Sequence, residues 1–240
     1  MIVDALVLAS SNAAAFWTVL AEARGYQLTR RPGYLAIHGT ERYGLRIMVL
    51  SPDLSAADRA ELQQTVSRHP SGPIMVEDPF GTVSVDGLTA RTLPVMIREP
   101  APVPGPPVDR VITKVTTKED LATAERIVVE GFTLDNFQPY RPGEVFPPAL
   151  LDHDAVEVFL LGTAGASFTI VDRGAGRPVV GVYWVTTLPE HRSRGVGRAL
   201  MLAALNRYAD LPMTLTASRA GKPLYDSLGF TTVTEAVWWV

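Results

Sequence analysis

The pattern of apolar and polar positions predicts helices and strands in alternation along the whole chain. The strongest strand is 179–187, because its residues are mostly β-branched or aromatic. Pro189 has no N–H for a sheet ladder and ends this strand. Beyond it, apolar residues between Leu200 and Tyr208 recur at helical spacing, which predicts a helix directly after the strand.

The same pattern predicts further elements on both sides of a proline-rich stretch. After it, Thr117 caps a helix with Asp120 three residues on, and strands are expected at 111–115, 156–161, 167–171 and 231–240. Before it, Ser11 or Asn12 is expected to cap a helix that Gly25 ends. A hairpin, a strand, a helix and two strands follow, at 26–38, 45–50, 55–69, 74–76 and 88–98.

Residues 99–109 contain five prolines and one glycine and are expected to form an extended spacer. We therefore place a domain boundary there, between an N-terminal unit (1–98) and a C-terminal unit (110–240). The alternative is a proline-rich loop within one domain.

Both units have a similar order of elements, which suggests a diverged internal repeat. Aligning Pro52 with Pro189 sets Asp58 opposite Gly195 and Ala60 opposite Gly197, while Ser55 replaces Arg192. A carboxylate would then occupy the place of an anion site and repel the anion. His38 and His69 of this unit are interpreted as structural, in a strand and at a helix end.

Composition narrows the classes of function. The chain has 240 residues, 47% of them hydrophobic, and a net charge of −3, so no attraction to nucleic acid or to an anionic membrane is expected. The absence of cysteine excludes disulfides, a thiol nucleophile and a cysteine-bound zinc, and the four histidines lack metalloprotease spacing. We expect no signal peptide and no apolar segment long enough to cross a bilayer, and hence a cytoplasmic protein.

The residues after Pro189 combine glycine and arginine at a helix start. A helix start has free N–H groups and the positive end of the helix dipole, so it attracts anions. Two glycines let an anion approach the backbone closely, and arginines add charge. The sequence here predicts a diphosphate site formed by Arg192, Ser193, Arg194, Gly195, Val196, Gly197 and Arg198. A third glycine, as in dinucleotide sites, and a P-loop lysine are both absent.

The run Arg192-x-x-Gly195-x-Gly197 after a Leu-Pro strand end resembles the acyl-CoA motif of the GNAT superfamily of N-acyltransferases. Residues 218–230, SRAGKPLYDSLGF, resemble the second motif of that family, in the same order and at the same spacing. The resemblance implies an α/β (α+β) fold with a mixed sheet flanked by helices in the C-terminal half. A smaller, related, degenerate unit would precede it.

The resemblance also implies a chemistry, the transfer of acetyl from acetyl-CoA to a primary amine without a metal. The backbone of Val185, Thr186 and Thr187 would bind the thioester carbonyl and pantetheine at a splayed strand end. Arg192 to Arg198 would hold the pyrophosphate, and Arg194 and Arg198 would also reach a 3′-phosphate. Ser218 stands where the family commonly has asparagine, Gly221 where it has alanine, and Pro223 falls in the expected helix.

Tyr225 of the second motif is the predicted general acid, because a phenol is protonated at neutral pH and can donate to a forming thiolate. The general base is not assigned among Glu157, Asp152, His153 and His191. Glu157 alternates within a strand pattern and is interpreted as a solvated, outward-pointing carboxylate. The aromatic residues of the segment 131–148 are expected to line the acceptor pocket.

Two other functions stay open. A non-catalytic acyl-CoA-binding sensor would keep the diphosphate site without acid–base chemistry, and a nucleotide-binding protein would use the same loop for ATP or NAD. The sequence predicts no nucleic acid partner and no membrane partner. An oligomer is compatible with the sequence and unsupported by it.

Overall fold

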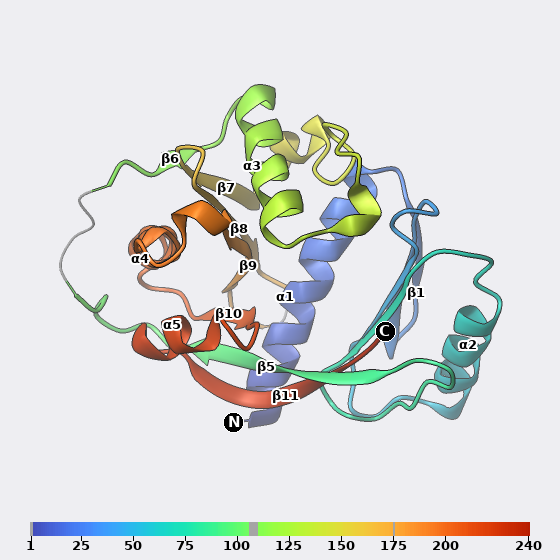
Figure 1. Ribbon diagram of the computed structural model, residues 1–240. Coiled ribbons are helices and arrows are strands. Elements are labelled where there is room, and N and C mark those ends of the chain that lie inside the picture. Colours follow the sequence, from blue (N-terminus) through green and yellow to red (C-terminus); the bar gives the residue numbers. More distant parts are fainter. Residues whose placement is uncertain (1, 106–109, 175) are drawn as a thin grey trace.

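A single mixed sheet runs through both halves of the chain in the computed structural model, which describes residues 2–105, 110–174 and 176–240 (Figure 1). Its strands follow the order β1-β2-β3-β4-β11-β5-β10-β9-β8-β7-β6. The N-terminal half contributes α1 (Ile2–Ala23), β1 (Gln27–Arg30), β2 (Tyr34–His38), β3 (Leu45–Val49), α2 (Ala56–Ser67), β4 (Ile74–Asp78) and β5 (Ala90–Arg98). The C-terminal half contributes β6 (Thr113–Lys114), α3 (Lys118–Gly131), β7 (Val156–Leu161), β8 (Gly165–Asp172), β9 (Val179–Thr187), α4 (Val196–Arg207), β10 (Met213–Thr216), α5 (Lys222–Ser227) and β11 (Thr231–Trp239), with short 3₁₀ turns η1 (Asp135–Phe137), η2 (Pro148–Asp152) and η3 (Pro189–His191). This confirms the predicted mixed sheet flanked by helices.

The two halves exchange their last strands. β5 lies between β10 and β11 and is antiparallel to both, and β11 lies between β5 and β4. On either side of this pair the sheet continues through a parallel pair, β9 with β10 and β3 with β4. Figure 1 shows β5 and β11 side by side along the lower edge of the molecule. The predicted units 1–98 and 110–240 therefore share one sheet, and residues 106–109 of the predicted spacer lie outside the described residues.

Helices cover both faces of the sheet. α1 and α3 pack with Phe168 and Ile170 of β8 on one face. α4 and α5 pack on the opposite face against Val180 and Val182 of β9, and α2 covers Ile47 of β3. Because β-strand side chains alternate between faces, the apolar runs of the central strands supply both cores.

Helix α1 begins at Ile2, nine residues before the predicted cap at Ser11. Asn12 lies in mid-helix, fully buried, where its Nδ2 donates to the carbonyls of Ile170 (3.3 Å) and Val179 (3.0 Å). Its Oδ1 accepts the Tyr183 hydroxyl at 2.7 Å. Asn12 therefore connects the two halves of the chain. Its partners supply the hydrogen bonds that a buried polar group needs.

The expectation that no segment is long enough to cross a bilayer was wrong for α1. Residues Asp4–Ala23 form a helix that is long and apolar enough to cross a membrane by length and composition alone. Of the most apolar stretch of this helix, 56% is buried inside the protein, and Phe16 and Leu20 are fully buried. The structure uses α1 as a core helix.

The strand predictions differ from the structure at two places. β6 covers only Thr113–Lys114 of the expected strand 111–115, and β10 was not predicted.

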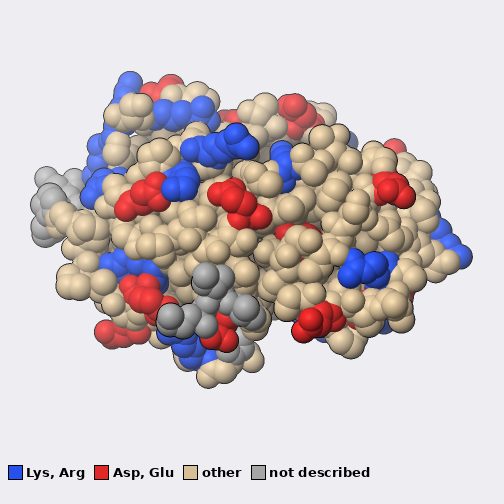
Figure 2. All heavy atoms as spheres, turned by 90° about the horizontal axis from the view of Figure 1, so that it is seen from below, with Lys and Arg blue, Asp and Glu red and all other residues tan. Residues whose placement is uncertain are grey.

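On the face in Figure 2, acidic and basic side chains are interspersed over a mostly uncharged surface, as the small net charge leads one to expect.

Gly181→Ala is expected to destabilise the protein by about 1–3 kcal/mol, the usual cost of overpacking. A Cβ at Gly181 would lie 1.7 Å from Oδ1 of Asn12 and 2.5 Å from Cε2 of Tyr183. Denaturant unfolding of the single variant measures the loss. In an Asn12→Ala background the same substitution should cost less, and an equal cost in both backgrounds would contradict the contact.

Candidate active site

Strands β9 and β10 separate shortly after they meet. Their parallel pairing covers only Met213↔Val180 and Thr214↔Gly181. β9 continues from there to Thr187 along β8, where Ala166 and Gly165 pair with Thr186 and Thr187. The edge of β9 that faces β10 is thus free of ladder partners over its second half, so its backbone groups can bind a ligand.

A bulge shapes this free end of β9. The register between β8 and β9 shifts between Ala166 and Phe168, and Trp184 has a φ of 53°, which is uncommon for a bulky residue. Val185 and Thr186, two of the three residues predicted to bind the thioester, have different surroundings next to this bulge. Val185 packs with the α4 and α5 side, whereas the Thr186 hydroxyl donates to the Trp184 carbonyl at 2.8 Å.

Helix α4 starts without the usual protection of its N-terminus. Gly195 is the N-cap with a φ of 77°, and the first backbone bond joins Ala199 N to Gly195 O at 2.9 Å. Among the described residues no side chain caps α4, and its first turn carries no acidic residue. The N–H groups of Gly197 and Arg198 therefore precede the helical ladder and form an open anion site.

The arginines around this start have different partners. Arg192 donates to the carbonyls of Thr187 (3.3 Å) and Gly131 (3.0 Å), so it ties the loop to β9 and to the end of α3. Ser193 and Arg194 are exposed, and the Arg194 carbonyl accepts Arg110 at 2.8 Å. Arg192 is thus engaged with backbone carbonyls, whereas the side chain of Arg194 is exposed and has no partner among the described residues.

The second motif lies directly beside this loop. Arg198 donates to Ser227 Oγ of α5 at 2.9 Å, and Ser218 Oγ accepts Gly221 N–H at 3.0 Å, so the serine supports the turn that leads into α5. Pro223 falls in the first turn of α5, where its missing N–H costs nothing. The structure therefore brings the two motifs together at one end of the β9–β10 gap.

Tyr225 is buried in the same apolar cluster as Val182 and Leu215, the walls of the gap. Burial raises the pKa of its phenol to about 12. Among the described residues no partner is found for its hydroxyl. A phenol that stays protonated throughout the physiological range and has no internal acceptor is suited to donate a proton to a ligand.

The predicted repeat would set β3, β4 and α2 of the N-terminal half opposite this site, and these elements lack its features. β3 and β4 stay paired from Leu45↔Ile74 to Met48↔Glu77, so no gap opens. Helix α2 is capped by Ser55, which accepts from Asp58 N at 3.0 Å. If the two helices are aligned by their N-caps, Ser55 stands opposite Gly195 and Asp58 opposite Arg198, three residues away from the alignment by prolines. A carboxylate still occupies the first turn, which disfavours an anion there.

Comparison with known proteins agrees with this geometry. Residues 152–232 match the family model described as the acetyltransferase (GNAT) domain. This segment is a GNAT domain. The match confirms the predicted family resemblance. The GNAT family is a family of acyltransferases that use acyl-CoA donors.

The fold with its GNAT domain also resembles solved structures over nearly the whole chain. A GCN5-related N-acetyltransferase from Kribbella flavida superposes with a TM-score of 0.60 at 16% identity, covering 97% of this chain and 95% of that one. A protein assigned to the GNAT family from Novosphingobium aromaticivorans gives 0.60 at 15% identity with the same coverage. A search of curated proteins found no match. At these identities the structural likeness shows the fold alone.

Glu157 of the GNAT domain, a candidate base, is not the solvated carboxylate that its strand pattern suggested. It is 7% exposed and binds Lys114 Nζ (2.7 Å), Arg207 Nη2 (2.8 Å) and the Tyr208 hydroxyl (2.5 Å). Arg207, then Lys114 and Tyr208, lower the pKa of Glu157 to about 2. Arg207 ends α4, so this cluster lies at the opposite end of the helix from the anion site.

Glu157→Gln is expected to lower the free energy of unfolding at pH 7 by about 2–3 kcal/mol, because two cations lose their buried partner. A carboxyl whose folded pKa of about 2 lies below its usual 4.5 stabilises the fold above pH 4.5, and this contribution is lost as the pH falls toward 2. Denaturant unfolding at pH 7 and pH 3 should show the difference from wild type shrinking at low pH. Glu61→Gln, at an exposed ion pair with Arg31, is the control and should change little.

The other base candidates stay predictions. Asp152 ends the turn η2, and His153 follows it with its N–H bonded to Leu150 O at 3.3 Å. His191 lies in η3 beside the anion site. The aromatic residues of 131–148, which were expected to line the acceptor pocket, differ in burial. Phe137 and Phe146 are buried in the core, whereas Phe132 is 43% exposed.

Two polar residues that sequence reasoning missed organise this region. Glu125 is fully buried on the apolar face of α3, and Arg42 extends from the turn between β2 and β3. Glu125 lies four residues after Leu121 and three before Val128, so the sequence places a charged residue on the apolar face of the helix. A charge at such a position indicates a buried, hydrogen-bonded carboxylate. For Arg42 the sequence offered none.

Proposed function

We propose that the GNAT domain transfers an acetyl group from acetyl-CoA to a primary amine. The proposal is carried by the packing of Tyr225 in one apolar cluster with Val182 of β9 and Leu215 of β10, the two strands that separate, and by the contact of its helix α5 with the uncapped start of α4. A thioester laid in the gap would place its diphosphate at Gly195–Arg198, where N–H groups and Arg198 offer positive charge.

The chain's own groups supply the steps of a direct transfer. Free backbone groups of β9 near Val185 would donate to the thioester oxygen as negative charge develops on it. The amine nitrogen forms the C–N bond, the C–S bond breaks, and the leaving thiolate takes the proton of the Tyr225 hydroxyl. The proton that the amine loses goes to water, since the chain presents no assigned base, and the tyrosine is reprotonated from solvent.

Calorimetric titration tests the donor side of the proposal. Acetyl-CoA should bind with one site per chain, because the paired strands and the capped helix of the N-terminal half leave no second site. ATP and NAD should bind much more weakly under the same conditions. Binding of ATP or NAD as tight as that of acetyl-CoA would favour the nucleotide-binding alternative and contradict the proposal.

A further inference from the structure

The segment 132–148, here called the acceptor loop, touches the candidate site at two places. The ring of Phe132 lies edge-on to Trp184 at 5.3 Å, and that of Phe146 lies 6.1 Å from it. Trp184 is the bulge residue of β9. Directly before the loop, Gly131 O accepts Arg192 from the anion-binding loop. The conformation of this segment is therefore coupled to the free end of β9.

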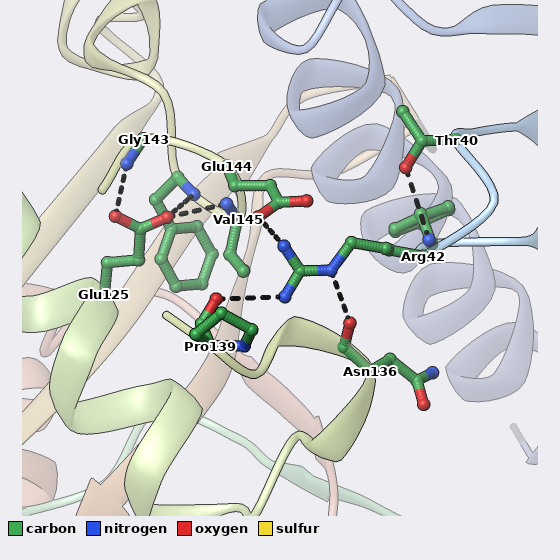
Figure 3. Close-up of polar contacts among 10 residues, drawn as sticks. Thr40, Arg42, Glu125, Asn136, Pro139, Gly143, Glu144 and Val145 are labelled. Atoms are coloured by element: carbon green, nitrogen blue, oxygen red, sulfur yellow. Dashed lines mark hydrogen bonds and ion pairs between the residues drawn. The ribbon is translucent and has the colours of Figure 1, made fainter. Parts of the chain in front are cut away.

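Glu125 holds the second half of the acceptor loop. Its carboxylate accepts the N–H groups of Gly143 (2.6 Å), Val145 (2.6 Å) and Phe146 (3.0 Å). It also accepts the Tyr140 hydroxyl at 3.0 Å. Figure 3 shows the loop backbone gathered around this carboxylate. Because Glu125 is fully buried, these donors replace its lost hydration and fix the loop to α3.

Arg42 holds the first half of the loop from the N-terminal half of the chain. Its Nε donates to Asn136 O (2.7 Å) and its Nη2 to Pro139 O (3.2 Å), and its Nη1 pairs with Glu144 at 2.5 Å (Figure 3). A planar guanidinium satisfies three acceptors in fixed directions, which a lysine cannot do. Arg42 thus joins points of the loop that lie eight residues apart in the sequence, from Asn136 to Glu144.

The loop lies on the face of the sheet opposite to the anion site. Phe137, Phe146 and Trp184 belong to the core of α1 and α3, whereas Tyr225 and Val185 belong to that of α4 and α5. A donor bound at the start of α4 occupies the α4 side of the β9–β10 gap. That leaves the opposite face of the sheet, where the loop contacts Trp184 at the free end of β9, for the approach of the amine.

We propose that Arg42 is a positioning residue through which the N-terminal half sets the affinity for the amine. This inference rests on the proposed function. Arg42 touches no reacting atom; it holds the acceptor loop against α3 and Trp184, and the ordered loop forms the amine side of the site. The N-terminal half of the chain thereby contributes to amine binding without binding a donor.

The test combines hydrogen exchange with kinetics on Arg42→Ala. Amides of 134–146 should exchange at least about tenfold faster, because the loop opens more often without its clamp. KM for the amine should rise at least about fivefold, while KM for acetyl-CoA stays within twofold. Arg31→Ala, an exposed arginine of the same half that pairs with Glu61 on α2, is the matched control and should change neither quantity.

Unchanged amide exchange in 134–146 would show that Arg42 does not hold the acceptor loop. Equal rises in KM for the amine and for acetyl-CoA would show that Arg42 does not act selectively on amine binding. Should Arg42→Ala fold poorly, Glu144→Ala removes the ion pair alone and is measured in the same way. The exchange result judges the clamp even if no amine is turned over. Absence of turnover with a rigid loop and bound acetyl-CoA would count against the proposed function and not against the clamp.

Discussion

Tyr225→Phe should lower kcat by about 10²–10³-fold, within the usual contribution of a positioned proton donor. The substitution removes only the hydroxyl, and the ring keeps its place in the cluster with Leu215 and its edge contact with Phe230. Binding of acetyl-CoA and the free energy of unfolding should therefore stay close to wild type. Steady-state kinetics with a responsive amine, together with calorimetry, measures both.

The pH profile adds a second check on Tyr225. Since burial raises the pKa of its phenol to about 12, the tyrosine stays protonated below that pH and contributes no loss of rate between pH 7 and pH 10. Tyr208→Phe is the matched control, because Tyr208 binds Glu157 at the other end of α4. If kcat of the Tyr225→Phe enzyme stays within twofold of wild type, another group or water protonates the thiolate.

Gly197→Glu should weaken acetyl-CoA binding by about 10²-fold. A Cβ at this position would lie at ordinary contact distances, 3.5 Å from Leu224 Cδ2 and 3.7 Å from Thr187 Oγ1, so the fold accommodates it. The added carboxylate would occupy the positive end of α4, where it stabilises the helix and repels a diphosphate. Calorimetric titration gives the affinity, and thermal unfolding confirms the fold.

Gly197→Gln separates charge from size in this experiment. The glutamine has nearly the same shape as the glutamate and no charge, so it should bind acetyl-CoA more tightly than the glutamate variant by about tenfold. Increasing salt should narrow the gap between the two. Equal affinities at low salt would contradict an electrostatic role for the start of α4.

Local features of the site could be predicted from the sequence because they depend on neighbouring residues. The β-branched strand 179–187, its end at Pro189 and the glycine loop each follow from local conformational rules. The cap at Thr117 was confirmed for the same reason, with Oγ1 3.1 Å from Asp120 N. These elements position the anion site.

Other features depend on what lies across the sheet and could not be predicted. Glu157 alternates like a solvent-facing residue, yet α4 brings Arg207 over it. The start of α1 was placed late because Asn12 resembles a cap, whereas its partners are carbonyls more than 150 residues away in the sequence. The exchange of β5 and β11 between the halves likewise has no local signal.

Transfer of acetyl to an amine is tested most directly by measuring thiol release from acetyl-CoA against a panel of polyamines, aminoglycosides, amino acids and peptide N-termini. Wild type and Tyr225→Phe are compared side by side, with acetyl-CoA binding of each checked by calorimetry. At least one amine should accelerate thiol release in wild type and should lose that acceleration in the variant. Tight acetyl-CoA binding with no response to any amine would contradict the proposed transfer and would favour an acyl-CoA sensor.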